Sequence, residues 1–302
     1  MISTTGRLAL GSRRKAKVGT RVSTVERAGW LQTLIAWAVG LLFFFPVFYL
    51  IVTGFKTEAA AVLLPPQLFP IGDELPAGFT PTLENYQVIF DRGFGPFFLN
   101  SVIVVTASSL LIVMLALPCA YALVWRRGRR SSNVMFFFLS TKFLPAVGVI
   151  IPIFIIARNL KMIDNLATLV VMYTAMNLAI AIWLLRSFLD EIPRDVIQAA
   201  RVDGANLRQE IQHVAIPMIF PGLVATLFIC IIFAWNEFFF AVNLMATKGA
   251  TVPMFMIGFV TSEGLFWAKL AAAGTMAMMP VVILGWLAQK QLVRGLSMGA
   301  VK

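Results

Sequence analysis

Six long apolar stretches constrain this chain more than any other feature of its sequence. A helix needs about 20 mostly apolar residues to cross the hydrocarbon core of a membrane. The stretches that reach this length are Trp30–Val52, Phe97–Trp125, Val134–Ile156, Leu166–Leu185, Gly222–Met245 and Phe266–Ala288. The sequence therefore predicts an all-α integral membrane protein with six transmembrane helices.

The composition agrees with a membrane protein. Charged residues make up 13% of the 302 residues and the mean hydropathy is +0.85. A soluble domain carries about 25% charged residues, so this chain has too little polar surface to cover a water-soluble globule.

The charges between the apolar stretches predict the orientation. Residues 1–29 hold seven Lys or Arg against one acid, whereas residues 56–92 hold two basic residues against five acids. The run Arg126-Arg127-Gly128-Arg129-Arg130 is basic again, as is the C-terminal tail. Because Lys and Arg concentrate in cytoplasmic loops, both termini are predicted to lie in the cytoplasm.

This topology divides the chain into three parts. Residues 1–29 are a basic cytoplasmic segment, residues 30–288 are the six-helix domain, and residues 289–302 are a cytoplasmic tail. A cleaved signal peptide has a shorter apolar core and a small-residue cleavage site. The stretch from Trp30 lacks both features, and we interpret it as an uncleaved first helix.

Several other classes of protein are disfavoured. The net charge of +11 arises from basic runs beside apolar stretches and not from a basic surface interleaved with aromatics, so no nucleic-acid partner is expected. Cys119 and Cys230 lie far apart in apolar runs, which favours packing over a metal site. We find no phosphate-binding loop of the form G-x-x-x-x-G-K-[ST] and no catalytic constellation, and the lone His213 fits a surface or interface position. No catalytic residue, bound cofactor or metal is predicted.

The loop at residues 186–221 does not fit a plain membrane protein, because its charges are many and nearly balanced. Pro193 suits the first turn of a helix, and Gly204 suits the left-handed residue that ends one. Asn206 and Gln209 then form a capping box for a second, amphipathic helix, which Pro217 is expected to disturb. The amphipathic helix fits either a helix lying on lipid headgroups or part of a docking surface, where Ala199 and Ala200 would allow close approach.

The same loop resembles a known motif. It contains Gln198-Ala199-Ala200-Arg201-Val202-Asp203-Gly204-Ala205, with Ile216-Pro217 and Pro221-Gly222 following. This pattern is similar to the EAA loop of binding-protein-dependent ABC importer permeases. The maltose-type carbohydrate branch is further indicated by Trp183-Leu184-Leu185-Arg186-Ser187-Phe188, Ile192-Pro193, Ala234-Trp235-Asn236-Glu237-Phe238, and the tail segments Leu292-Val293-Arg294-Gly295-Leu296 and Gly299-Ala300-Val301-Lys302.

The resemblance implies a type I importer permease fold in a bacterial inner membrane, with helix 193–203 as a coupling helix. The implied partners are a second permease subunit in a heterodimer, two copies of an ABC ATPase that use ATP and Mg²⁺, and a periplasmic solute-binding protein. It also suggests that the loop at about Thr247 to Leu265 reaches toward the binding protein. The residues implied to couple to the ATPase are Gln198, Ala199, Ala200, Asp203 and Gly204.

One position departs from the motif, because Gln198 stands where the family has Glu. In the family that carboxylate is thought to engage basic residues of the ATPase. A glutamine still forms hydrogen bonds but supplies no charge-assisted contact. The coupling contact is then weaker at this position, or it is shared with Asp195 or Asp203.

Polar residues inside the apolar stretches are candidates for the pathway or subunit interface, because such residues are costly in a membrane. Glu237 lies within the fifth stretch beside Asn236, and we favour a place at an interface or cavity for both. Lys142 lies near the middle of the third stretch, where snorkelling, pairing and lining the pathway all stay open.

Two alternatives remain. An ion-coupled secondary transporter would use Glu237 as its coupling carboxylate, but such folds usually have two related halves, which we do not see. A membrane-anchored signalling protein would need a sizeable soluble domain. Neighbouring genes for an ATPase and a binding protein would favour the importer. The segment Ser140-Thr141-Lys142-Phe143-Leu144-Pro145 resembles the sugar-alcohol subset, which suggests sorbitol or mannitol over maltose or trehalose.

Overall fold

The structure is a computed structural model that describes residues 29–69, 78–125, 131–246, 248–261 and 264–298. The chain divides into two compact units, residues 1–46 and 47–302, and the first helix crosses the boundary between them. Some charges used to predict the orientation lie outside the described residues, namely those of residues 1–28, Asp73, Glu74, the 126–130 run and Lys302. The orientation with both termini inside therefore stays a prediction.

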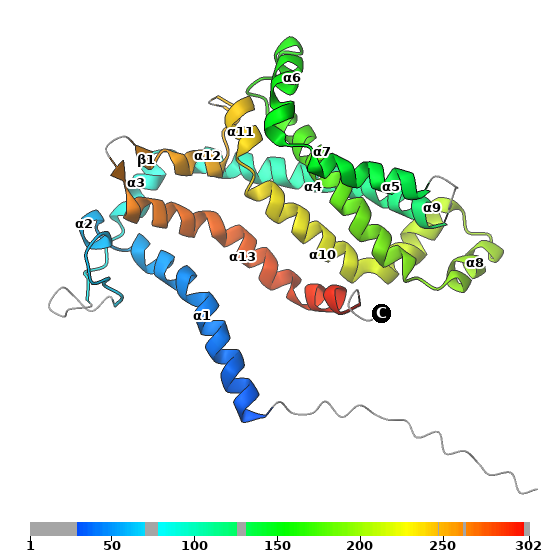
Figure 1. The fold of residues 1–302 in the computed structure, drawn as a ribbon, viewed down its shortest axis with the longest axis horizontal. Coiled ribbons are helices and arrows are strands. Elements are labelled where there is room, and N and C mark those ends of the chain that lie inside the picture. The colour runs from blue at the N-terminus through cyan, green and yellow to red at the C-terminus, as the bar shows by residue number, and fades with distance from the viewer. Residues whose placement is uncertain (1–28, 70–77, 126–130, 247, 262–263, 299–302) are drawn as a thin grey trace, which may run out of the picture. The chain divides into compact units, whose positions relative to one another are not determined.

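The described residues are almost entirely helical (Figure 1). Up to the long loop, the helices are α1 (Trp30–Gly54), α2 (Glu58–Ala61), α3 (Glu84–Asp91), α4 (Phe94–Trp125), α5 (Ser131–Ser140), the 3-10 turn η1 (Thr141–Phe143), α6 (Ala146–Asn159) and α7 (Leu166–Asp190). From the loop onward they are α8 (Arg194–Val202), α9 (Leu207–Gln209), the π-helical turn η2 (Glu210–Ala215), α10 (Ile216–Trp235), α11 (Phe239–Leu244), α12 (Val252–Ile257) and α13 (Trp267–Met298). Two-residue strands β1 (Val260–Thr261) and β2 (Gly264–Leu265) pair antiparallel.

Five of these helices are long and apolar enough to cross a membrane: α1, α4, α7, the run from α9 to α10, and α13. A sixth span is counted only if α5, η1 and α6 act together. The structure thus confirms a helical protein with several apolar spans.

The third predicted helix, Val134–Ile156, is not continuous. Its two parts meet at an angle of 91°. The break falls at Leu144 and Pro145, both of which have extended backbone conformations. A residue before proline is driven out of the helical region by the proline ring, so the predicted stretch forms two helices joined by a sharp bend.

The fifth predicted helix, Gly222–Met245, is also interrupted. The helix α10 ends at Trp235, and α11 begins only at Phe239. In the other direction the helix extends further back than expected, because Pro217 occupies the first turn of α10 and does not stop it. The π-helical turn η2 leads directly into α10, so the helical run from Leu207 to Trp235 continues through Pro217.

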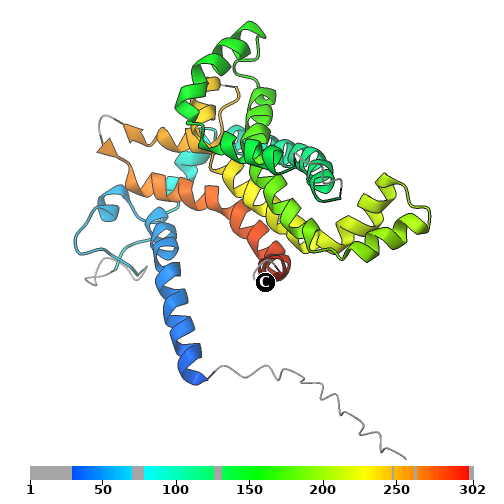
Figure 2. The same ribbon diagram turned by 45° about the vertical axis from the view of Figure 1, so that its right-hand side comes forward.

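Buried side chains form two clusters within residues 47–302. One cluster joins α4, α7, α10 to α12 and α13 near Trp235 and Phe255, and the other joins the ends of α4 and α7 to α8, η2 and α10. The helices α4 and α7 pack along each other, and α10 packs against α4, α7 and α13 (Figures 1 and 2). Apolar burial against neighbouring helices therefore positions the loop that contains α8.

Candidate functional site

The segment from Pro193 to Gln209 has the local structure that its sequence predicts. Pro193 precedes the first turn of α8, and Gly204 ends the helix with a φ of +84°, a conformation that glycine adopts without steric cost. Asn206 and Gln209 form both hydrogen bonds of a capping box, at 3.0 and 2.9 Å. The predicted helix, tight turn and second helix are therefore confirmed.

One side of α8 is anchored to the helical bundle. Ile197 is fully buried and joins the same cluster as Val124 of α4 and Ile219 of α10. Figures 1 and 2 show α8 at the end of the bundle, beyond α5 and the start of α10. The helix is therefore packed at the bundle end and is not a free loop.

The remaining surface of α8 brings the predicted coupling residues together. Gln198, Ala199, Asp203 and Gly204 are exposed, and Ala200 is half-buried. Val202 beside them is 87% exposed, which is unusual for a valine in a packed loop. The structure places all five predicted residues on one short helix and its C-terminus. Their docking to an ATPase stays a prediction.

A buried polar network holds α8 in place, and sequence reasoning missed it. Glu210, the first residue of η2, accepts hydrogen bonds from Arg201 Nε at 2.9 Å and from Arg201 Nη2 at 3.1 Å. Its carboxylate also accepts a hydrogen bond from the hydroxyl of Tyr121 on α4. The network therefore joins the last turn of α8 to η2 and to the end of α4. The only sequence signal was a glutamate on the apolar side of an amphipathic helix.

The ion pair in this network is buried on one side only. The Glu210 side chain is 6% exposed, whereas that of Arg201 is 47% exposed. Hydrogen bonds to Glu210, and then to Tyr121, raise the pKa of Arg201 above its ordinary value, so the guanidinium stays charged. A buried carboxylate needs such partners because its desolvation is costly.

The polar residues of the apolar stretches do not form one site. Lys142 is exposed in η1, and its ammonium lies 5.9 Å from the ring centre of Phe233. Asn236 follows α10 and donates to the backbone oxygen of Ile232 at 2.9 Å. In the part of the chain that the structure describes, no hydrogen bond or ion pair joins Lys142 to Asn236 or Glu237.

Glu237 lies in the break between α10 and α11, and not within a helix as expected. Its carboxylate accepts hydrogen bonds from the backbone N–H groups of Phe240 at 2.8 Å and of Ala241 at 3.3 Å. These N–H groups belong to the first turn of α11, where a helix leaves its donors unpaired. The contacts give Glu237 a structural role at the start of α11.

Asp164 is a second anchor that the sequence did not reveal. It has a φ of +58°, and its carboxylate accepts from the backbone N–H groups of Ala246, Lys248 and Gly249 at 2.9 to 3.1 Å. The loop before α7 is thereby tied to the segment that follows α11. This segment begins the region expected to reach toward a binding protein.

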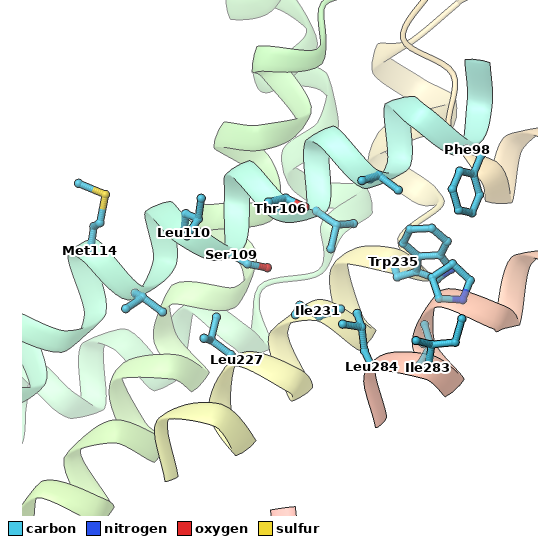
Figure 3. A pocket seen from close by; sticks show the side chains of 15 residues that line it. Phe98, Thr106, Ser109, Leu110, Met114, Leu227, Ile231, Trp235, Ile283 and Leu284 are labelled. Carbon is cyan, nitrogen blue, oxygen red and sulfur yellow. The ribbon is translucent and has the colours of Figure 1, made fainter. Parts of the chain in front are cut away.

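A cavity of about 680 Å³ lies between α4, α10 and α13 (Figure 3). Its lining is almost wholly apolar, with Thr106 and Ser109 among its few polar side chains. A site for a sugar needs convergent hydrogen-bonding groups, and this wall does not supply enough of them. Among the described residues, no group of three or more His, Cys, Asp or Glu side chains is arranged to hold a metal ion.

The structure has several helices long and apolar enough to cross a membrane, and comparison with known proteins identifies the family. Residues 112–298 match the family described as "Binding-protein-dependent transport system inner membrane component". The chain belongs to this family of membrane transport components.

Individual relatives agree with this assignment. The inner membrane ABC transporter permease protein YcjP of Escherichia coli is 30% identical over 94% of this chain and 100% of its own length. The trehalose transport system permease protein SugB of Mycobacterium tuberculosis is 32% identical over 74% of this chain and 83% of its own. A bacterial ABC transporter that imports the acidic polysaccharide alginate contains a chain with the same fold, at a TM-score of 0.70 and 22% identity over 87% of this chain and 95% of that one.

These comparisons settle the broad identity. The chain is a multi-pass inner-membrane permease subunit, and its relatives are permeases of ABC importers, several of them for sugars. The ion-coupled alternative is not supported, because the family works with binding proteins and Glu237 caps α11. The predicted family of ABC importer permeases and the predicted inner-membrane localisation are thus confirmed.

Proposed function

We propose that this chain is the permease subunit of an ATP-driven importer that takes up a sugar or a sugar alcohol. A periplasmic binding protein delivers the substrate, and a second permease subunit completes the pathway. Two copies of a separate ATPase bind and hydrolyse ATP. Residues 193–204 transmit the movement of the ATPase to the membrane helices.

The observation that carries this proposal is the combination of anchoring and exposure in α8. Ile197 and the Arg201–Glu210 pair fix one side of the helix to the bundle. Ala199 and Val202 leave the other side open, with small or apolar side chains that a partner surface can cover. A segment that transmits force needs both a rigid attachment and a free contact surface.

The uncharged side chain at position 198 affects which residues can contact the ATPase. Gln198 is exposed, and so are Asp195 and Asp203 on either side of it. Since Gln198 carries no charge, we propose that these two carboxylates supply the charge-assisted contacts to the ATPase.

The substrate class rests on relatives and on one segment of sequence. Relatives include permeases for trehalose and for diacetylchitobiose. The segment 140–145, which contains Lys142, favours a sugar alcohol such as sorbitol or mannitol. Because the described cavity is apolar, we propose that the partner permease supplies most of the hydrogen bonds to the substrate.

Cysteine cross-linking tests the coupling role. Both native cysteines are replaced, A199C is introduced, and the candidate ATPase and partner permease are co-expressed in membranes. We expect a short cross-linker to join A199C to the ATPase, with a yield that changes when ATP is added. The matched control is R208C, which is exposed on α9 but lies off the α8 contact surface.

The outcome separates the two interpretations of the loop. If the complex assembles but neither A199C nor neighbouring probes at Asp195 and Val202 reach the ATPase, the docking role is wrong. Equal cross-linking from A199C and R208C would also contradict it, because it would indicate nonspecific proximity.

A further inference from the structure

The bend between α5 and α6 leaves a polar segment of the chain exposed at membrane depth. The two helices meet at 91°, and all residues from 140 to 145 are exposed. Figures 1 and 2 show α6 projecting away from the long helices, beside α11. Non-helical backbone at this depth is tolerated only where protein covers it or water reaches it. The segment 140–145 therefore faces either another subunit or water.

Lys142 of this segment lies close to the centre of the membrane. It is near the middle of the apolar stretch Val134–Ile156. The helix α5 below it packs against the spanning helix α7 and has ten residues. Ten helical residues rise about 15 Å, which is half of a hydrocarbon core about 30 Å thick. Because lysines reach the headgroups only from near helix ends, the ammonium of Lys142 needs water or a partner where it stands.

The ring of Phe233 on α10 lies beside Lys142 at the same depth. The ammonium nitrogen Nζ is 5.9 Å from the centre of this ring. Phe233 is at the middle of the apolar stretch Gly222–Met245, so the two depths agree. The residue is 46% exposed, which leaves part of the ring uncovered. The fold thus places several N–H donors next to an open aromatic face.

Lys142 has no anionic partner within the described residues, since no ion pair or hydrogen bond there involves it. The carboxylate of Glu237 accepts from backbone N–H groups of α11 instead. An unpaired cation inside a membrane is costly and marks either a pathway or a partner's charge. A carboxylate of a second subunit placed over Phe233 would meet the negative face of its ring. A neutral, hydroxyl-rich ligand avoids this repulsion, because its oxygens accept from the ammonium while its C–H groups cover the ring.

We propose that Lys142 and Phe233 together contact the transported sugar or sugar alcohol at the middle of the membrane. The ammonium of Lys142 donates hydrogen bonds to hydroxyl oxygens of the ligand, and an apolar face of the ligand packs on the ring of Phe233. The inference rests on the proposed importer function and deepens it, because it assigns substrate contacts to this chain. The remaining hydrogen bonds come from the partner permease.

Cysteine accessibility tests whether Lys142 faces the aqueous pathway. Cys119 and Cys230 are replaced, K142C is introduced, and the complete complex in membrane vesicles is treated with a charged, membrane-impermeant thiol reagent from each side in turn. We expect K142C to be labelled, and we expect labelling to slow when the transported sugar is present. The matched control is V147C, which is 69% exposed on α6 among apolar residues and should not be labelled.

Uptake by proteoliposomes tests the two contacts directly. The complex is supplied with ATP and saturating binding protein, and the labelled probes are sorbitol, mannitol and trehalose. K142M should lower the uptake rate about tenfold, the effect of losing one charge-assisted hydrogen bond. K142R keeps donors and should restore most of the uptake. F233L should lower it about threefold, because leucine keeps apolar volume but loses the flat ring face.

Four results would overturn the proposal. Equal labelling of K142C and V147C, or none of K142C, would show that the pathway does not pass Lys142. Labelling that the transported sugar does not slow would place the ligand elsewhere, and so would unchanged uptake in K142M. Failure of K142M to assemble with the partner permease, corrected by K142R, would assign Lys142 to a subunit interface.

The inference and the proposed function fail separately. If the wild type takes up a probe and A199C cross-links to the ATPase while K142M transports normally, only the substrate contact is wrong. Absence of uptake of every probe by the assembled wild type would contradict the proposed substrate class, and this inference would fail with it.

Discussion

Arg201 at the end of α8 and Glu210 at the start of η2 are joined by two parallel hydrogen bonds, from Nε at 2.9 Å and from Nη2 at 3.1 Å. The two residues lie on opposite sides of the turn that contains Gly204. Their pairing closes this turn and, through Tyr121, connects it to α4. A force applied to α8 thus has a direct route to a membrane-spanning helix.

Replacing Glu210 with Gln should loosen this connection. The glutamine amide presents a donor to the donors of Arg201, and the variant loses the charge-assisted bonds. We expect a loss of roughly 1–3 kcal/mol in the local free energy of unfolding. Transport should fall several-fold more than basal ATP hydrolysis by the assembled complex, because the ATPase can still turn over.

The measurement is the ratio of substrate transported to ATP hydrolysed in proteoliposomes. The control is E191Q, since Glu191 is exposed after α7. An unchanged ratio in E210Q, with normal assembly, would show that the network has no part in coupling. Y121F removes only the hydroxyl and should have a weaker effect in the same direction.

The stability that Asp164 contributes should depend on both its hydrogen-bond acceptors and its left-handed backbone conformation. D164N keeps an acceptor for two of the three N–H groups and tolerates a φ of +58°. D164A loses all three hydrogen bonds and retains the strain of a left-handed residue. We expect a loss of about 1 kcal/mol for D164N and about 3 kcal/mol for D164A.

Thermal unfolding of the purified full chain measures this difference. Because α11 and the segment after it depend on Asp164, limited proteolysis near Lys248 should increase in D164A before global unfolding. Equal stability of the two variants would contradict the predicted contribution of the three N–H contacts.

The sequence predicted the parts of the fold that depend on local rules. The apolar stretches gave the membrane helices, because the length that spans a membrane is fixed by its thickness. The turn at Gly204 and the capping box at Asn206 were also correct, since each depends on residues only a few positions apart. The family motif then marked α8 as the segment of interest.

The features that the sequence did not predict depend on contacts between distant residues. Tyr121 lies 89 positions from Glu210, and Asp164 lies 82 positions from Ala246. Nothing in a single sequence pairs such residues. Pro145 was a signal for the break at Leu144 and Pro145. A proline alone, however, does not show whether a helix is only kinked there or fully broken. Pro152, Pro118 and Pro221 lie within continuous helices.

Gly222 should be the glycine least tolerant of a side chain among those on the membrane helices. A Cβ added there would overlap Cγ, Cδ1 and Cδ2 of the Phe188 ring on α7. Rotation of the ring about its Cβ–Cγ bond leaves Cγ in place, so it cannot relieve this overlap. G222A should therefore lose roughly 1–3 kcal/mol through overpacking. The control is G148A in α6, where the nearest neighbour is Pro145 Cγ at an ordinary 3.6 Å.

The yield of folded protein and its thermal midpoint distinguish these variants. We expect G148A to match the wild type or to exceed it slightly, because alanine favours a helix over glycine. If G222A matched G148A, the close approach of α7 and α10 at this point would be wrong.

Glu237 provides the sharpest test between an ATP-driven and an ion-coupled mechanism. If its carboxylate only caps α11, E237Q should retain transport, because the amide oxygen still accepts the N–H of Phe240. E237A should lower the free energy of unfolding by about 1 kcal/mol, the usual value of a helix cap. A coupling carboxylate would behave differently, since E237Q would abolish uptake.

Uptake by the assembled complex is measured with ATP supplied and the ion gradients collapsed by ionophores. Continued uptake in both the wild type and E237Q is expected, because in the proposed mechanism the energy comes from ATP and Glu237 acts through the structure of α11.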